Sequence, residues 1–142
     1  MITRSATAVW QGGLKDGKGH ISTQTGALRD ARYGFRSRFE SGPGTNPEEL
    51  LGAAHAGCYS MALALSLENA GIIAERIETR AEVALEQVHG GFVISAVHLT
   101  CKARIPRIDM AMFDQIAQTT KQTCPISRVL NARITLDACL DG

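Results

Sequence analysis

Short apolar runs separated by glycine-rich turns dominate the first forty residues. Their β-branched and aromatic content, with turn clusters on either side, predicts three strands, at 5–10, 19–25 and 32–39. In the third segment Tyr33, Phe35 and Phe39 share one face if side chains alternate as in a strand. Arg36 and Arg38 then fall on the opposite face, which favours a solvated position for both.

The pattern changes to a long helix after residue 45. Asn46 is a typical N-cap, Pro47 suits the first helical position, and Glu49 completes a capping box. Gly71 is typical of the residue just past a helix end. Between these signals, residues 50–67 contain no formal charge.

This helix carries an apolar stripe at helical spacing, made up of Leu50, Ala54, Cys58, Met61 and Leu65. A membrane span is disfavoured, because glycine, histidine and serine dilute the apolar run and the flanking charges are acidic rather than basic. We therefore expect the helix to lie at the centre of a soluble core. Its many small residues would allow another backbone to approach closely.

The rest of the chain predicts a hairpin, two helices and a closing strand. The expected segments are strands at 76–88 and 92–105 with a turn at 89–91, a helix at 110–123 capped by Asp109, a short helix within 124–132, and a strand at 133–140. In the second hairpin strand one face holds Val93, Val97, Leu99, Cys101 and Ala103, which makes Cys101 a core residue. The elements predict an α+β fold of mostly antiparallel strands around a central helix, in one domain over residues 1–142.

Charge and cysteine usage narrow the function classes. The net charge of +1 gives no electrostatic reason to expect nucleic acid or an anionic membrane as a partner. The first residues lack the apolar core of a secretory signal, which predicts a cytoplasmic protein with reduced thiols. The four cysteines include no CxxC pair, so a zinc site is not indicated.

Cys58 and Cys124 are the two thiols that could carry chemistry. A cysteine on an apolar helix is most often an inert packing residue. Cys124, however, precedes Pro125 and so lies at a helix start, where exposed N–H groups favour a thiolate. Local electrostatics alone make Cys124, rather than Cys58, the thiol of lower pKa. His55, three residues before Cys58, could form a Cys–His dyad or half a metal site, although no second ligand pair is evident.

Three segments resemble one known family. The strings YGFRSRFE, GTNPEELLGAAHAGCYSMAL and CPISRVLNARITLD, in this order, are similar to the OsmC branch of the OsmC/Ohr superfamily, and the likeness covers nearly the whole chain. The resemblance implies a cysteine-dependent peroxidase that reduces organic hydroperoxides. It also implies an intertwined homodimer, in which strands of both chains wrap two long central helices.

Residue by residue, the resemblance assigns Cys58 as the peroxidatic cysteine and Cys124 as the resolving one. Arg38 corresponds to the activating arginine, and Glu48 to its carboxylate partner. The Ohr branch instead carries its arginine in the first turn, where this chain has Leu14 and Lys15. That departure favours the OsmC branch.

The implied reaction fits these residue types. A thiol of pKa about 8.5 is mostly protonated at neutral pH, and a shielded arginine would stabilise its thiolate while a glutamate orients the arginine. The implied cycle passes from a Cys58 sulfenic acid to a Cys58–Cys124 disulfide, which an external dithiol of the lipoyl type reduces. It needs no metal, flavin or haem. Leu50, Leu51 and Met61 would favour an alkyl peroxide.

Helix geometry adds a constraint, since Glu48 and Cys58 lie about 15 Å apart on a straight helix. Either the helix bends near Gly52 or Gly57, or the neighbouring subunit supplies Arg38 and Glu48. We expect the second arrangement, an active site shared across the dimer. Two rival interpretations stay open at this point: a non-catalytic dimer with packing cysteines, and a Cys–His hydrolase.

Overall fold

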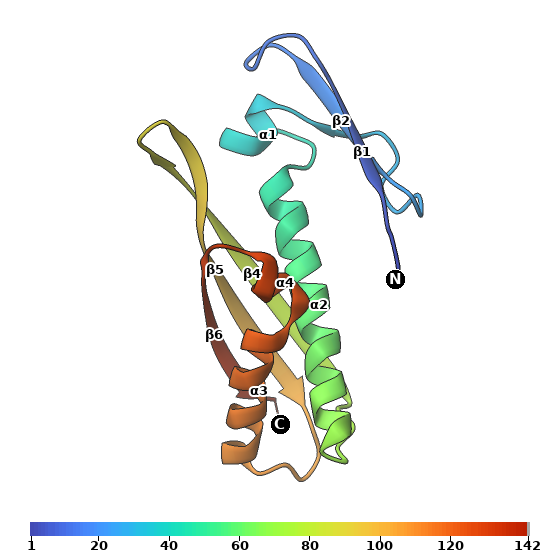
Figure 1. Cartoon of the computed structure of the whole chain (residues 1–142), viewed down its shortest axis with the longest axis vertical. Helices are drawn as coiled ribbons and strands as arrows, with labels where there is room; N and C mark the ends of the chain where they lie inside the picture. Colours follow the sequence, from blue (N-terminus) through green and yellow to red (C-terminus); the bar gives the residue numbers. More distant parts are fainter. Residues whose placement is uncertain (142) are drawn as a thin grey trace. The chain divides into compact units, whose positions relative to one another are not determined.

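The computed structural model describes residues 1–141. Its contacts divide the chain into two compact units, Met1–Leu50 and the part that begins at Leu51. Figure 1 shows the elements of both in chain order.

The first unit is built on a three-stranded antiparallel sheet. Its strands lie in the order β1-β2-β3, with bounds β1 Ala6–Gln11, β2 Lys18–Thr23 and β3 Ala31–Tyr33 (Figure 1). The first two strands agree with the expected segments. Trp10 on β1 packs against Tyr33 on β3, with ring centroids 5.4 Å apart. This aromatic pair spans the sheet on one face because both residues lie opposite Gly19 of β2, which has no side chain to separate them.

The third predicted strand is wrong beyond Tyr33, because residues Phe35–Phe39 form a short helix, α1. The Phe35 and Phe39 rings pack with centroids 5.1 Å apart, and Arg36 pairs with Glu40. Both are contacts between residues four apart, which face each other on a helix. Arg38 therefore lies on a helical turn rather than on the outer face of a strand.

Helix α2 spans Pro47–Asn69, as the capping signals predict. The side-chain oxygen of Asn46 accepts a hydrogen bond from the Glu49 N–H at 2.7 Å. Gly71 adopts a φ of +78°, and the N–H of Ile72 reaches back to the Leu67 carbonyl at 2.9 Å. This Schellman-type arrangement ends the helix where glycine is the residue of lowest strain.

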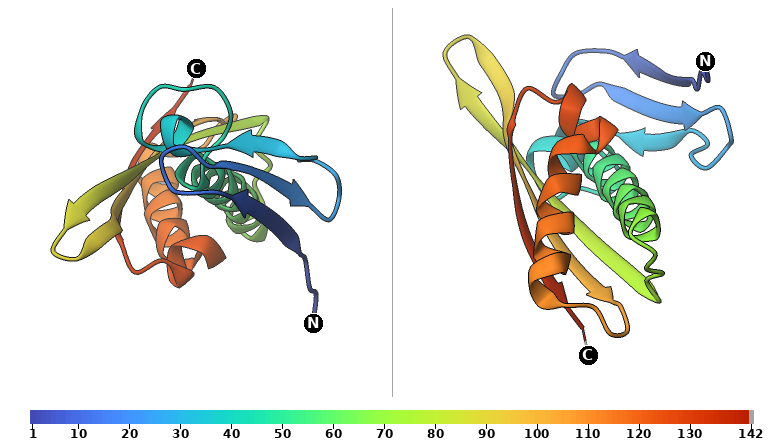
Figure 2. Two further views of the ribbon diagram at one scale, coloured as in Figure 1. Left: turned by 90° about the horizontal axis from the view of Figure 1, so that it is seen from above. Right: turned by 60° about the horizontal axis from the view of Figure 1, so that its bottom comes forward.

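The second unit contains a three-stranded sheet and two further helices, all within a few residues of the predicted segments. The elements are β4 Arg76–Val88, β5 Gly91–Arg104, α3 Met110–Thr123, α4 Pro125–Val129 and β6 Arg133–Leu140. Strand β5 is central, antiparallel to β4 and parallel to β6. Figure 2 shows α3 lying along the sheet beside β6. The α+β class predicted from the sequence is confirmed.

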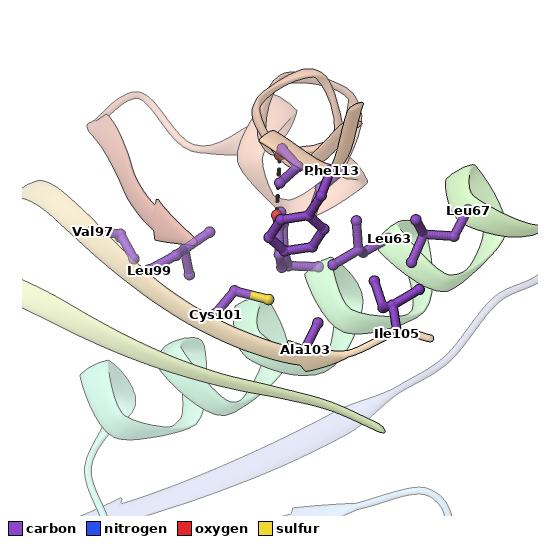
Figure 3. Close-up of a cluster of buried hydrophobic side chains, with 11 residues drawn as sticks. Leu63, Leu67, Val97, Leu99, Cys101, Ala103, Ile105 and Phe113 are labelled. Carbon is purple, nitrogen blue, oxygen red and sulfur yellow. Dashed lines mark hydrogen bonds between the residues drawn. The ribbon is translucent and has the colours of Figure 1, made fainter. Parts of the chain in front are cut away.

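The core of the second unit lies between β5 and the two long helices. Side chains from α2, β5 and α3 are fully buried there, and Figure 3 shows them converging: Leu63, Leu67, Val97, Leu99, Cys101, Ala103 and Phe113. The hydroxyl of Tyr59 donates a hydrogen bond to the Ala117 carbonyl at 3.0 Å, which ties α2 to α3. Cys101 is part of this core, as its strand face predicts.

Val93 departs from the predicted face of β5, since its side chain is 42% exposed. The register of the hairpin shifts between Ala84 and Leu85, where β5 carries one extra residue, Ser95. Such a bulge changes the alternation of side chains beyond it. Val93 therefore belongs to the exposed end of the hairpin and not to the core.

Helix α2 is buried on one face only, so the expectation that it lies at the centre of the core is wrong within a single chain. Met61 is 78% exposed and Leu65 is 59% exposed. Among residues 1–141, α2 is the helix that is long and apolar enough to cross a membrane, a property that core helices share. Of its most apolar 18-residue stretch, 28% is buried. The apolar side chains of Met61 and Leu65 are thus exposed among the described residues.

Phe113→Ala is expected to destabilise the fold by about 3–5 kcal/mol, because it removes a fully buried ring and leaves a cavity. The neighbouring residue Met112 is 38% exposed and provides the control, for which Met112→Ala should cost under about 1 kcal/mol. Urea unfolding of both variants measures the difference. Equal losses would contradict the placement of the core.

Candidate active site

The structure brings Cys58 and Cys124 into contact. Their sulfur atoms lie 3.3 Å apart although the residues are 66 positions apart in the chain. Cys58 is half-buried on α2, and Cys124 is fully buried at the junction of α3 and α4. Both thiols are free.

Proline explains how Cys124 is presented. Pro125 disfavours helical geometry at the preceding residue, and Cys124 accordingly has a ψ of 126°, which ends α3. Its N–H still donates to the Thr120 carbonyl at 2.9 Å, so the residue is anchored to α3. The chain turns there and begins α4, leaving the thiol directed at Cys58. A disulfide bond is about 2.05 Å long, so bridging needs a movement of little more than 1 Å by the two sulfur atoms.

Burial and hydrogen bonding act in opposite directions on Cys58. Removal from water raises the pKa of its thiol, and the neighbouring Cys124 thiol adds to that rise. The backbone N–H of Ile126, in the first turn of α4, hydrogen-bonds to the Cys58 sulfur and lowers the pKa. The helix start that appeared in the sequence to favour a Cys124 thiolate thus provides a donor to Cys58.

Ile126 was not identified from the sequence as part of the site. Proline has no N–H, so Ile126 supplies the first free amide donor after Cys124 at the start of α4. The dipeptide Cys124-Pro125 therefore indicates that the next residue, Ile126, carries the first free N–H of α4. Only the packing of α4 beside α2 shows that this donor meets Cys58.

Arg38 and Glu48 form a bidentate ion pair within the first unit. The Nε and Nη2 atoms of Arg38 lie 3.1 and 3.0 Å from the two carboxylate oxygens of Glu48. The Glu48 side chain is 11% exposed and that of Arg38 is 36% exposed. Thr45 donates its hydroxyl to Glu49, leaving Glu48 as the carboxylate that orients Arg38.

An apolar hollow of about 240 Å³ adjoins Arg38 in the same unit. Its wall is largely aromatic, formed by Trp10, Leu14, Tyr33, Gly34, Phe35 and Phe39. The guanidinium carbon of Arg38 lies 5.4 Å from the centroid of the Phe39 ring. The hollow therefore combines an apolar wall with one oriented cation.

The predicted substrate-binding residues are distributed differently. Leu50 and Leu51 are half-buried where α2 passes from one unit to the other. Met61 lies in a separate hollow of about 310 Å³, together with Ser60 and Ile77. Neither Cys58 nor Cys124 lines that hollow, so its shape does not link Met61 to the two thiols.

His55 does not form the dyad with Cys58 that its spacing allowed. Its Nε2 atom lies 2.8 Å from the hydroxyl of Ser127 on α4, and its Nδ1 atom has no hydrogen-bond partner among residues 1–141. The side chain is fully buried, and burial lowers the pKa of His55. The imidazole is therefore neutral at pH 7 and occupied with Ser127.

The other two cysteines differ from this pair. Cys101 is fully buried, and burial raises the pKa of its thiol to about 11, with a smaller opposing effect of a hydrogen bond to Thr79. Cys139 is exposed on β6. Within residues 1–141 no group of three or more His, Cys, Asp or Glu side chains is placed to hold a metal ion.

Comparison with known proteins agrees with this fold. Residues 40–138 match the family described as OsmC-like protein. Peroxiredoxin OsmC of Escherichia coli (strain K12) is 49% identical over 136 residues, which cover 96% of this chain and 95% of that protein. Organic hydroperoxide resistance protein OhrB of Bacillus subtilis (strain 168) is 26% identical, covering 82% of this chain and 84% of that one.

A solved structure shows the same architecture. An organic hydroperoxide resistance protein from Elizabethkingia anophelis superposes with a TM-score of 0.74 at 26% identity, covering 99% of this chain and 98% of that one. This chain is therefore a dithiol protein: it has an α+β fold and two free thiols whose sulfur atoms are in contact. The chain belongs to the OsmC-like family, and the resemblance to the OsmC/Ohr superfamily is confirmed.

Mild oxidation with diamide should join Cys58 to Cys124 selectively, because their sulfur atoms are already in contact. Cys101 should stay reduced at pH 8, since its pKa of about 11 leaves almost no thiolate. Peptide mapping by mass spectrometry identifies the bonds, with Cys124→Ser as the control that must lose the link. A dominant bridge to Cys101 or Cys139 would contradict the geometry.

Proposed function

We propose that this chain reduces organic hydroperoxides to alcohols, with Cys58 as the attacking thiol and Cys124 as the resolving thiol. One observation carries the proposal: two free thiols 66 residues apart lie with their sulfur atoms 3.3 Å apart. In a reducing compartment a structural disulfide is not expected, so such a pair favours redox chemistry over packing. We further propose that the protein is cytoplasmic.

The enzyme class rests on kinship. A relative that is 49% identical over nearly the full length is named a peroxiredoxin, and more distant relatives are named organic hydroperoxide resistance proteins. The chain is therefore an enzyme of the thiol peroxidase class, as the sequence predicted. The catalytic residues, the substrate and the recycling partner are proposals beyond that class.

The proposed cycle has three steps. The Cys58 thiolate attacks the terminal peroxide oxygen, the O–O bond breaks, and the alkoxide leaves as an alcohol after taking a proton. The resulting Cys58 sulfenic acid is attacked at sulfur by Cys124, which forms the disulfide and releases water. An external dithiol, of the lipoyl type, then reduces the disulfide by exchange and becomes oxidised itself.

Cys58 needs help to react as a thiolate. Burial raises the pKa of its thiol, and the Ile126 N–H opposes that effect only in part. A guanidinium shielded from water stabilises a thiolate and can also donate to the peroxide oxygen. We assign this role to Arg38, which Glu48 already holds in one orientation through two hydrogen bonds.

We place Arg38 and Glu48 beside Cys58 of a partner subunit. Glu48 precedes Cys58 by ten residues on α2, about 15 Å along a straight helix, and α2 is helical over the whole range Pro47–Asn69. A homodimer would also cover the exposed apolar face of α2, where Met61 and Leu65 lie. Gly57 faces open space, since a Cβ built on it meets no atom within 4 Å among the described residues. Because glycine has no side chain, a helix of the partner subunit could approach α2 closely there.

The proposed substrate is a hydroperoxide with an apolar organic group. The aromatic hollow beside Arg38, about 240 Å³ in volume, suits such a group better than hydrogen peroxide. Leu50, Leu51 and Met61 are retained as proposed contacts of that group across the dimer. The net charge of +1 gives no support for nucleic acid or an anionic membrane as a further partner.

Stoichiometric cumene hydroperoxide should convert the reduced protein to the Cys58–Cys124 disulfide, and excess dithiol should sustain turnover. Cys58→Ser should abolish turnover, because the nucleophile is lost. Arg38→Ala should lower kcat/KM about 100-fold by removing an oriented donor, whereas Arg36→Ala, an exposed arginine on the same helix, should leave it within about two-fold. Peroxide consumption and disulfide mapping provide the measurements. Unchanged thiols after peroxide treatment would instead favour a non-catalytic dimer.

Mixed dimers test the shared site. A heterodimer of one Cys58→Ser chain and one Arg38→Ala chain would contain one complete site if Arg38 acts across the interface, so about half of the wild-type activity should return. The Cys58→Ser homodimer should be inactive, and the Arg38→Ala homodimer should keep only about 1% of the wild-type kcat/KM. Purification through two different affinity tags verifies the heterodimer, and a verified heterodimer without activity would place both residues in sites formed within one chain.

A further inference from the structure

We propose that His55 and Ser127 form a positioning pair that holds the first turn of α4 against α2 and so aims the Ile126 N–H at the sulfur of Cys58. The inference deepens the proposed function and rests on it, since Cys58 is there the attacking thiol. His55 and Ser127 touch neither the peroxide nor the reacting sulfur on this proposal. They act through the position of Ile126.

The pair connects two elements at the level of the thiols. His55 lies on α2 three residues before Cys58, so both side chains project from the same side of the helix about one turn apart. The Nε2 atom of His55 lies 2.8 Å from the Ser127 hydroxyl. Ser127 lies three residues beyond Cys124, whose sulfur is 3.3 Å from that of Cys58. It directly follows Ile126, whose N–H lowers the pKa of Cys58 as a hydrogen-bond donor. Ile126 thus interacts with Cys58, and the next residue, Ser127, bonds to His55 one turn earlier on α2.

Helix α4 needs such a tether because it is only five residues long. A helix of that length has little stability of its own and depends on its contacts. Ile126 and Leu130 pack against the core, which holds the helix near the sheet. Those apolar contacts are not directional, so by themselves they do not fix the rotation of α4 about its axis. The bond from Ser127 to a buried imidazole restricts that rotation.

The energetic cost of His55 argues for a specific role. The side chain is fully buried and its Nδ1 atom has no hydrogen-bond partner among residues 1–141. An unpaired buried polar atom is unfavourable, and an apolar side chain of similar size would avoid the penalty. The cost is explained if the other ring nitrogen supplies a geometric constraint that an apolar residue cannot. Burial lowers the pKa of His55, so the imidazole contributes no charge of its own at pH 7.

The pair makes a distinct prediction for the reactivity of Cys58. Without the tether, the Ile126 N–H would lose its alignment, and hydrogen bonds weaken steeply with misalignment. The Cys58 thiolate would then be less stable, and its measured pKa would rise. Cys124 is the titratable group that the structure places against Cys58, and it would be unchanged in every variant.

The experiment measures the pH dependence of Cys58 alkylation by iodoacetamide in the full-length reduced protein, resolved by peptide mass spectrometry. Ser127→Ala and His55→Leu each remove the bond, whereas Ser127→Thr keeps the hydroxyl. Ser60→Ala is the matched control, because it removes a hydroxyl on α2 that pairs with Thr79 and not with α4. Thermal unfolding of each variant records any general loss of stability.

We expect Ser127→Ala and His55→Leu to raise the Cys58 pKa by roughly half to one unit and to slow its alkylation at pH 7 about three- to ten-fold. Ser127→Thr and Ser60→Ala should stay within about two-fold of wild type. The double variant should resemble either single variant, since both remove the same bond. If His55→Leu fails to fold, Ser127→Ala carries the test.

A wild-type alkylation profile in Ser127→Ala would overturn the inference, even if the melting temperature falls. So would equal effects of Ser127→Ala and Ser60→Ala. The proposed function is tested separately, because alkylation requires no peroxide. If Ser127→Ala and His55→Leu change Cys58 alkylation as expected but the wild-type protein does not react with hydroperoxide, the peroxidase proposal is wrong and the positioning pair is still supported.

Discussion

The packing of Tyr59 between α2 and α3 is the contact on which the rest of the site depends. Its ring is fully buried, and its hydroxyl donates to the Ala117 carbonyl of α3. Tyr59 is the neighbour of Cys58, and α3 leads directly to Cys124. Leu63 and Phe113 belong to the same buried cluster as Tyr59, in which side chains of α2 and α3 meet those of β5 (Figure 3). The Tyr59 bond thus ties α2 to α3 one residue from Cys58, whose sulfur contacts that of Cys124 at the end of α3.

The packing that brings the two thiols together also removes Cys58 from water, which opposes formation of its thiolate. A sulfur removed from water is harder to ionise, and the structure shows this as a raised pKa of Cys58. The first compensation is the Ile126 N–H, which costs no additional charge. The second is the proposed Arg38, whose own charge Glu48 balances through a bidentate pair. The site therefore combines a half-buried Cys58 thiol with one backbone donor, and Arg38 is the proposed second donor.

The two faces of α2 have different roles. One face carries Tyr59 and Leu63 into the core of the second unit, and the other leaves Met61 and Leu65 exposed. A helix with two apolar faces cannot satisfy both within a chain that packs against only one. Core helices share this membrane-like composition, and the proposed homodimer would cover the exposed face.

The sequence alone determined the features that depend on neighbouring residues: the Asn46 cap, the Gly71 helix end and the hairpin turn, which the structure places at His89 and Gly90. Each is decided by local backbone geometry. Its failure at Phe35–Phe39 has the same origin, since a spacing of four residues fits both a strand and a helix. For Cys58, Cys124, Arg38 and Glu48, family resemblance singled out the residues. Only the tertiary structure decided that Ile126 donates to Cys58 and that His55 bonds to Ser127. Those contacts join segments far apart in the chain, and their geometry is set by how α4 packs on α2.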